Sequence, residues 1–83
     1  MLLTVDIGNT TVAIAGLRGD QVAFVKKLPS DPAQDWTVSL QDLLEGVEAK
    51  GAVLSSVVPA LTGPVGEGLN AITGKPVLVV DKT

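Results

Sequence analysis

The first 28 residues of the chain alternate short apolar runs with turn residues. Residues 1–5 are an apolar run, residues 11–17 are rich in Val, Ile and Ala, and residues 21–28 form a third segment of this kind. Short segments rich in β-branched residues favour strands, and the Arg-Gly-Asp sequence at residues 18–20 is typical of a turn. The pattern therefore predicts a meander of three strands.

The hydrophobic period changes to that of a helix after residue 30. The Ser-Asp-Pro sequence at residues 30–32 offers a capping residue followed by proline at a first-turn position. Four apolar residues then repeat at i, i+3, i+4 and i+7, namely Leu40, Leu43, Leu44 and Val47. We predict an amphipathic helix that ends near Gly51. Trp36 lies one turn before this face, so we expect it in the core or in an interface.

A second helix is expected between two further strands. The apolar run at residues 52–58 is consistent with a buried strand. Helical phase then returns at Leu61, Val65, Leu69 and Ile72. We expect Pro64 in the first turn of this helix, capped by Thr62, and Gly74 at its end. With a short strand at residues 76–80, the order is βββαβαβ in a single α/β domain, and both returns to the sheet should be right-handed parallel crossovers.

Composition and charge restrict the class of protein. The chain has 83 residues, of which 46% are hydrophobic and 18% charged, which excludes a disordered tail and indicates one soluble globular domain. Its apolar runs are too short to span a bilayer. The net charge of −3 argues against a nucleic-acid partner. The only adjacent basic pair, Lys26 and Lys27, is interpreted as a solvated strand end.

Two missing residue types limit the chemistry. The chain contains no cysteine and no histidine, which excludes Ser-His-Asp and Cys-His catalysis and most zinc sites. The N-terminus has no signal-peptide pattern, so a cytoplasmic location is the default expectation. The remaining acidic residues, such as Asp31 and Asp35, are interpreted as helix caps, first-turn charges and exposed faces.

A phosphate-sized turn at the end of the first strand carries the most informative chemistry. Asp6 would present a carboxylate at the strand tip, Gly8 lets backbone N–H groups approach a ligand, and Asn9 and Thr10 supply short side-chain donors. Because a carboxylate repels a phosphate, Mg²⁺ would lie between them, with Asp6 as its protein ligand. The motif predicts a nucleotide-phosphate site, although a Gly-Asn pair after a strand is also typical of a plain hairpin turn.

Two segments of the chain carry a family resemblance. Residues 2–11 read L-L-T-V-D-I-G-N-T-T, and residues 55–62 read S-S-V-V-P-A-L-T. Both motifs resemble the type III pantothenate kinases, within the actin, sugar-kinase and Hsp70 superfamily. The resemblance implies a ribonuclease-H-like fold that forms the first half of an actin-like ATPase. It also implies a transferase that moves the γ-phosphate of ATP to pantothenate in coenzyme A biosynthesis.

The same resemblance implies ligands and site residues. It assigns the ATP phosphates to Asp6, Gly8, Asn9, Thr10 and Thr11, and the metal to Asp6. Thr11 departs from a frequent asparagine, which is a mild change because a hydroxyl can also donate to a phosphate. The implied cofactors are Mg²⁺ with ATP and a monovalent cation such as K⁺, and the implied enzyme is a homodimer.

The second motif has two interpretations. Ser55 and Ser56 stand at the carboxyl end of a strand, where open parallel sheets place ligands, so their hydroxyls could face a cleft. Alternatively, they cap the next helix and Pro59 starts it. We therefore treat this pair as a second-rank cleft site.

The resemblance places the catalytic base beyond Thr83, so no catalytic residue is expected within the chain. Family members have a later Gly-x-Asp-Arg segment, whose aspartate is the base, and a second domain that closes over ATP. We therefore interpret residues 1–83 as a single N-terminal nucleotide-phosphate-binding domain without its second domain and expect little or no turnover from it alone. Asp81 could point into the same cleft, but a solvated terminal carboxylate is the favoured interpretation.

Two other functions remain open. The first is a non-catalytic binding or assembly module, whose exposed apolar surface would be buried by a second copy or a separate C-terminal domain. The second is a ribonuclease-H-like metal nuclease, which needs several converging carboxylates. Where the second carboxylate would be expected, this chain has Ser55 and Ser56.

Overall fold

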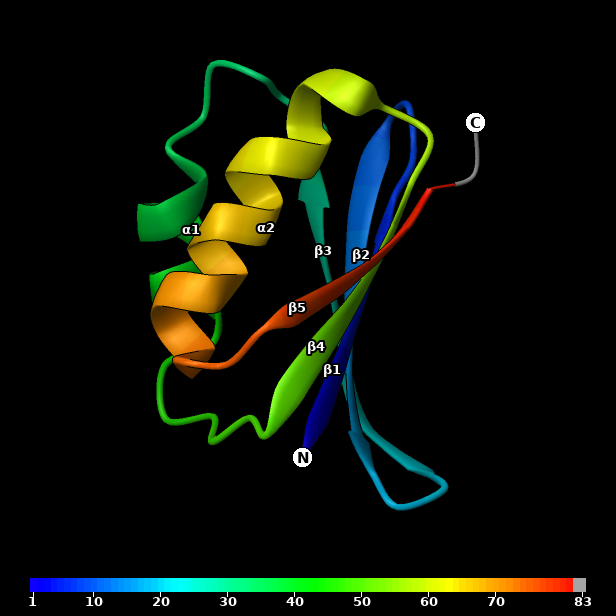
Figure 1. Cartoon of the computed structure of the whole chain (residues 1–83), viewed down its shortest axis with the longest axis vertical. Helices are drawn as coiled ribbons and strands as arrows, with labels where there is room; N and C mark the ends of the chain where they lie inside the picture. Colours follow the sequence, from blue (N-terminus) through cyan, green and yellow to red (C-terminus); the bar gives the residue numbers. More distant parts are fainter. Residues whose placement is uncertain (82–83) are drawn as a thin grey trace.

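Residues 1–81 fold into one five-stranded sheet with two helices on one of its faces (Figure 1). The computed structural model describes the backbone of residues 1–81 and the side chains of residues 1–80. The elements in chain order are β1 (Leu2–Ile7), β2 (Thr11–Arg18), β3 (Gln21–Pro29), α1 (Trp36–Leu43), β4 (Gly51–Ser56), α2 (Pro59–Thr73) and β5 (Val77–Asp81). The predicted order βββαβαβ is confirmed.

The strand order brings three carboxyl ends to one edge of the sheet. The order is β3-β2-β1-β4-β5, with β1 antiparallel to β2 and parallel to β4, and β4 parallel to β5. Asp6 is the register partner of Ser55, and Ser56 is the register partner of Asp81. The Val57 N–H donates to the Ile7 carbonyl at 3.1 Å just beyond the strand ends. The two motifs of the sequence therefore meet at this edge.

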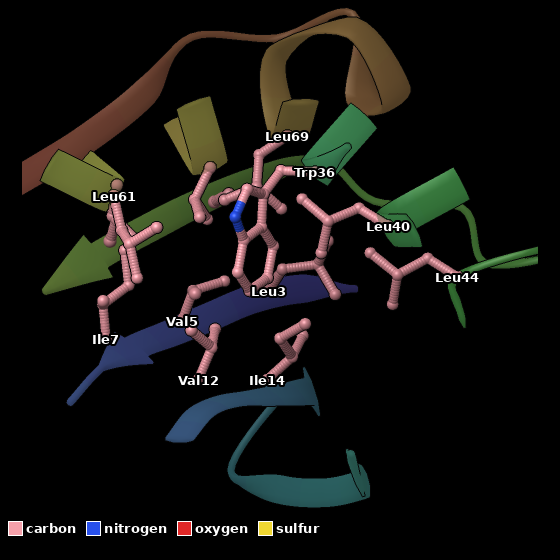
Figure 2. Close-up of a cluster of buried hydrophobic side chains, with 13 residues drawn as sticks. Leu3, Val5, Ile7, Val12, Ile14, Trp36, Leu40, Leu44, Leu61 and Leu69 are labelled. Carbon is pink, nitrogen blue, oxygen red and sulfur yellow. The ribbon is translucent and has the colours of Figure 1, made fainter. Parts of the chain in front are cut away.

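Side chains alternate along the strands between a face that packs in the core and a face without helices. The core residues are Leu3, Val5, Ile7, Val12, Ile14, Trp36, Leu40, Leu44, Ala52, Leu54, Leu61, Val65 and Leu69, and they fill the space between the sheet and the two helices (Figure 2). Residues at alternate positions, such as Thr4 and Asp6 of β1, point to the opposite face. We call this opposite side the helix-free face, since no described helix covers it.

The start of α1 differs from the prediction. We expected the cap within residues 30–32, but the helix begins at Trp36 and its N-cap is Asp35, whose Oδ1 accepts the Val38 N–H at 3.2 Å. The Asp31 carboxylate instead accepts the Ala33 N–H at 2.9 Å in a local turn. Both aspartates thus accept hydrogen bonds from backbone N–H groups, as expected of such residues. The second of them, Asp35, caps the start of the helix. Trp36 is buried, as predicted.

The end of α1 also differs from the prediction. The helix ends at Leu43 and not near Gly51, and the chain turns away at Gly46, whose φ of 80° favours glycine. The interpretation of Lys26 as a solvated strand end was wrong, because its Nζ donates to the Leu43 carbonyl at 2.7 Å. A lysine at a helix C-terminus satisfies an exposed carbonyl and complements the helix dipole. Val47 still packs against the core, although it lies outside the helix.

The second helix starts earlier than its predicted first turn. Pro59 occupies the beginning of α2, so Pro64 lies inside the helix and Thr62 is not its cap. The Thr62 hydroxyl donates to the Val58 carbonyl at 3.2 Å within the first turn. Proline at the start was one part of the alternative interpretation of this segment, and it is correct. The other part, that Ser55 and Ser56 cap the helix, is wrong, because the N-cap is Val58 and no described side chain makes a cap hydrogen bond. Gly74 ends α2 in the left-handed conformation with φ of 65°, as predicted. Among the described residues, neither helix has the length and apolar character needed to cross a membrane.

Candidate functional site

Asp6 lies at the carboxyl end of β1, on the helix-free face of the sheet. Its side chain is exposed, while Val5 and Ile7 on either side of it are buried in the core. In register it stands between Ala13 of β2 and Ser55 of β4. The central strand therefore holds the backbone of Asp6 rigidly from both sides and leaves its carboxylate accessible to solvent.

The turn between β1 and β2 closes with a short backbone bond. The Gly8 N–H donates to the Thr11 carbonyl at 2.9 Å, and the exposed residues Asn9 and Thr10 form the tip. A Cβ atom on Gly8 would lie 3.2 Å from the same Thr11 oxygen. This close approach is a steric reason for glycine at position 8, and the sequence alone did not show it. The expected donors Asn9 and Thr10 are accessible at the tip.

Ser30, a residue from the far side of the meander, binds this loop in two places. Its hydroxyl donates to the Gly8 carbonyl at 2.7 Å, and its backbone N–H donates to the Thr10 carbonyl at 2.9 Å. The sequence pattern at residues 30–32 indicated a helix cap at Ser30 and gave no sign of this role. The two partners Gly8 and Ser30 are 22 positions apart, so only the pairing of β2 with β3 brings them together.

The structure separates the two serines of the second motif. Ser56 is 3% exposed on the helix side, where its Oγ accepts the Val58 N–H at 3.0 Å and donates to the Val58 carbonyl at 3.1 Å. Ser55 lies on the helix-free face beside Asp6, and its buried Oγ has no hydrogen-bond partner in the described part of the chain. Ser56 thus shapes the turn into α2, while Ser55 has the only hydroxyl of the pair available to another group.

A shallow cavity of about 210 Å³ runs from Asp6 along the helix-free face. Its lining includes Thr4, Asp6, Ala13, Ala15, Val53 and Ser55. Pockets that enclose small ligands usually hold roughly 300–1,000 Å³, so this hollow is too small to enclose a nucleotide. A larger hollow of about 620 Å³, lined in part by Arg18 and Lys50, lies near the amino end of β1 and away from the motif.

The donor set around Asp6 fits a weakly coordinated Mg²⁺. No group of three or more Asp, Glu, His or Cys side chains that could hold a metal gathers among the described residues. A cation at Asp6 would therefore take most of its ligands from water and from a phosphate, which is the usual manner of Mg²⁺. A two-metal nuclease site would need more carboxylates than these residues supply.

Two expectations concern the last residues of the chain. The side chain of Asp81, considered above as a group that could reach the cleft, lies outside the described residues. Thr83, beyond which we expected the catalytic base of the family, also lies outside them. The position of Asp81 in the cleft and the location of the base after Thr83 therefore stay predictions.

Comparison with sequence families and relatives gives a consistent result. Residues 2–83 match the family model of type III pantothenate kinase. A type III pantothenate kinase from Dictyoglomus turgidum is 33% identical over 90 residues, which cover 98% of this chain and 35% of the relative. One from Rhodospirillum centenum is 39% identical over 74 residues, which cover 78% of this chain and 28% of the relative. The chain thus spans about a third of the length of these relatives.

Comparison with solved structures identifies the fold. The ROK hexokinase from Thermus thermophilus matches with a TM-score of 0.71 and 18% identity, over 96% of this chain and 34% of the hexokinase. The RuvC structure from the same organism matches with a TM-score of 0.69 and 12% identity, over 96% of this chain and 60% of that chain. At these identities the likeness concerns the fold alone. The predicted ribonuclease-H-like, actin-like fold class is confirmed.

Proposed function

The chain belongs to the type III pantothenate kinase family, and we propose that it is the N-terminal phosphate-binding domain of an enzyme that phosphorylates pantothenate with ATP. The enzyme would act in coenzyme A biosynthesis. The observation that carries the proposal is the turn between β1 and β2, where an exposed Asp6 precedes a tight loop with Asn9 and Thr10 at its tip. A phosphate needs such donors and a cation at the carboxylate.

Each residue of the loop has a role in the proposal. Asp6 would hold Mg²⁺, which offsets the charge of the phosphates when it is bound. Gly8 would keep the loop tight, while Asn9 and Thr10 would donate to phosphate oxygens. Thr11 begins β2 on the same face as Asp6, since the next residue, Val12, points into the core. Its hydroxyl would therefore be a further donor on the ligand side.

Ser55 is the second-rank member of the proposed site. Its Oγ is buried and lacks a hydrogen-bond partner among the described residues, beside the register position of Asp6. A buried hydroxyl without a partner is costly, and a bound ligand or an ordered water would satisfy it. We assign no ligand role to Ser56, because Val58 already engages its hydroxyl.

The proposal includes further polypeptide that forms a second domain. The relatives are about three times as long, and the helix-free face leaves Val25 58% exposed and Leu78 63% exposed. All-parallel sheets usually have both faces covered, and β1, β4 and β5 form a parallel part of this mixed sheet. We propose that further polypeptide supplies the acceptor site, the catalytic base and the closure over ATP, so residues 1–83 alone would have little turnover. On the basis of the family, the proposal also includes a requirement for K⁺, a homodimeric state and a cytoplasmic location.

Calorimetric titration with Mg-ATP tests the phosphate site. The wild-type chain should bind Mg-ATP, and the binding should be lost in Asp6→Asn and in a titration without Mg²⁺. Asp20→Asn is the matched control, because Asp20 lies in the turn between β2 and β3, away from the loop. If Asp6→Asn binds as tightly as the wild type, Asp6 is not the metal ligand. If the folded wild type binds nothing, the loop is not preformed in this chain.

A non-catalytic assembly module remains the second candidate, and the exposed apolar residues of the helix-free face favour it. It predicts oligomers of this chain in light scattering and no restored activity when a separately produced C-terminal part of a relative is added. A monodisperse monomer, or kinase activity restored by that addition, would exclude the module.

A further inference from the structure

We propose that Ser30 is the positioning residue of the phosphate loop, holding its peptide groups in the orientation that an anion requires. The inference rests on the proposed function for the identity of the ligand but not for the loop geometry. Ser30 follows β3 directly and contacts the loop through a side-chain bond to the Gly8 carbonyl and a backbone bond to the Thr10 carbonyl.

The two bonds fix the direction of two peptide groups. A peptide unit is planar and trans, so its N–H points opposite to its C=O. The Gly8 carbonyl shares its plane with the Asn9 N–H, and the Thr10 carbonyl shares its plane with the Thr11 N–H. Because both carbonyls point toward Ser30, both N–H groups point away from it. These two donors are thereby held in one orientation before any ligand arrives.

The same bonds remove two unfavourable groups from the site. Carbonyl oxygens only accept hydrogen bonds, so a carbonyl turned toward a phosphate repels it. In a loop this short, a rotation of either peptide would exchange a donor for an acceptor at the ligand. Ser30 opposes both rotations, since each would break a hydrogen bond of 2.7 or 2.9 Å. Its role is therefore to keep acceptors out of the anion site as well as to direct donors.

Ser30 is itself anchored to the core. The carbonyl of the next residue, Asp31, accepts the indole Nε1–H of Trp36 at 3.1 Å, and the Asp31 N–H donates to the Pro29 carbonyl at 2.9 Å. Trp36 is 2% exposed among the core side chains (Figure 2). A continuous chain of contacts thus connects the buried indole through Asp31 and Ser30 to the loop. The loop orientation is set by the core and not only by its own short turn.

Amide hydrogen exchange and Mg-ATP titration on the same chain test this inference. Ser30→Ala removes the hydroxyl bond to the Gly8 carbonyl, which should loosen the turn that the Gly8 N–H closes with the Thr11 carbonyl. Exchange of the Gly8 amide should therefore become about fivefold faster, the change that corresponds to one lost hydrogen bond in the loop, while amides in the middle of β1 keep their protection. Ser30→Thr retains a hydroxyl and should restore slow exchange. Ser39→Ala is the matched control, because Ser39 is another half-buried serine whose hydroxyl accepts from the Gln34 side chain away from the loop.

The outcomes separate this inference from the proposed function. Faster Gly8 exchange in Ser30→Ala, rescue by Ser30→Thr and a parallel loss of Mg-ATP affinity of about fivefold support both. If the wild type binds no Mg-ATP, the proposed function of the isolated chain fails, and the exchange rates alone decide the role of Ser30. Unchanged Gly8 exchange in Ser30→Ala overturns the inference. Faster exchange with undiminished Mg-ATP binding also overturns it, because the loop would then not need Ser30 to accept phosphate.

Discussion

Asp6 and Ser55 are register partners on the parallel strands β1 and β4, and both lie on the helix-free face. Asp6 is the last residue but one of β1, and Ser55 is the last residue but one of β4, the strand that follows α1. β1 has an antiparallel neighbour, β2, on one side and a parallel neighbour, β4, on the other. The site therefore lies where the strand direction in the sheet changes, at the carboxyl edge where open α/β sheets bind ligands. The next residue, Ser56, points to the opposite face because side chains alternate along a strand.

The two adjacent serines should respond oppositely to alanine substitution. Ser56→Ala leaves the Val58 N–H without its partner and should lower the free energy of unfolding by about 1 kcal/mol. Ser55→Ala removes a buried hydroxyl that has no described partner, so it should leave stability unchanged or raise it by up to about 1 kcal/mol. Urea denaturation measures both. Equal destabilisation by the two changes would contradict the assignment, and weaker Mg-ATP binding in Ser55→Ala alone would support its ligand role.

The close approach at Gly8 predicts a cost for a single methyl group. In Gly8→Ala the new Cβ would lie 3.2 Å from the Thr11 carbonyl oxygen, a backbone atom that also accepts the Gly8 N–H. We expect a loss of about 1 kcal/mol in thermal or urea unfolding, because the added methyl group meets a backbone atom with little room to move. Gly63→Ala is the control, because nothing lies within 4 Å of its Cβ and alanine favours the helix by about 1 kcal/mol. If Gly8→Ala is as stabilising as Gly63→Ala, the loop is not tightly closed.

Local pattern was enough to predict the order of the elements and the end of α2 at Gly74, but not the start of either helix or the end of α1. Period-two segments and the later helical phase gave the element order, because they depend on which residues face the core. The end of α1 depends on Lys26, which is 17 positions from its partner Leu43. The hydroxyl of Ser30 and its partner Gly8 are likewise far apart in the sequence, by 22 positions. The first contact needs α1 to lie beside β3, and the second needs β2 to pair with β3, so no local signal could show them. The motif at Asp6 was visible because its residues are adjacent in the chain.

Lys26 should contribute more to stability than its sequence neighbour. Lys26→Met keeps most of the aliphatic stem but loses the 2.7 Å bond to the Leu43 carbonyl and the position 5.4 Å from the centre of the Phe24 ring. We expect a loss of about 1–2 kcal/mol in the free energy of unfolding. Lys27→Met is the matched control, since Lys27 is exposed and should change stability by less than about 0.5 kcal/mol. Equal effects at the two positions would show that the end of α1 does not need the lysine.

A charge on the helix-free face tests whether this side of the sheet is an uncovered surface in the isolated chain. Val25 is 58% exposed on β3 and lines the cavity beside Asp6, whereas Ile14 on β2 is fully buried on the core side. Val25→Lys should cost less than about 0.5 kcal/mol in urea unfolding. It should also reduce any self-association seen by light scattering, because it interrupts the apolar surface.

Ile14→Ala provides the comparison, with an expected loss of about 2–5 kcal/mol from the cavity it creates. If further polypeptide covers the helix-free face in a longer protein, Val25→Lys should become strongly destabilising there, since a charge would be buried without a partner. A large loss in the free energy of unfolding for Val25→Lys in the isolated chain would instead mean that this face is already covered, by a second copy or by the chain itself. That result would favour the assembly module over the phosphate-binding domain of a kinase.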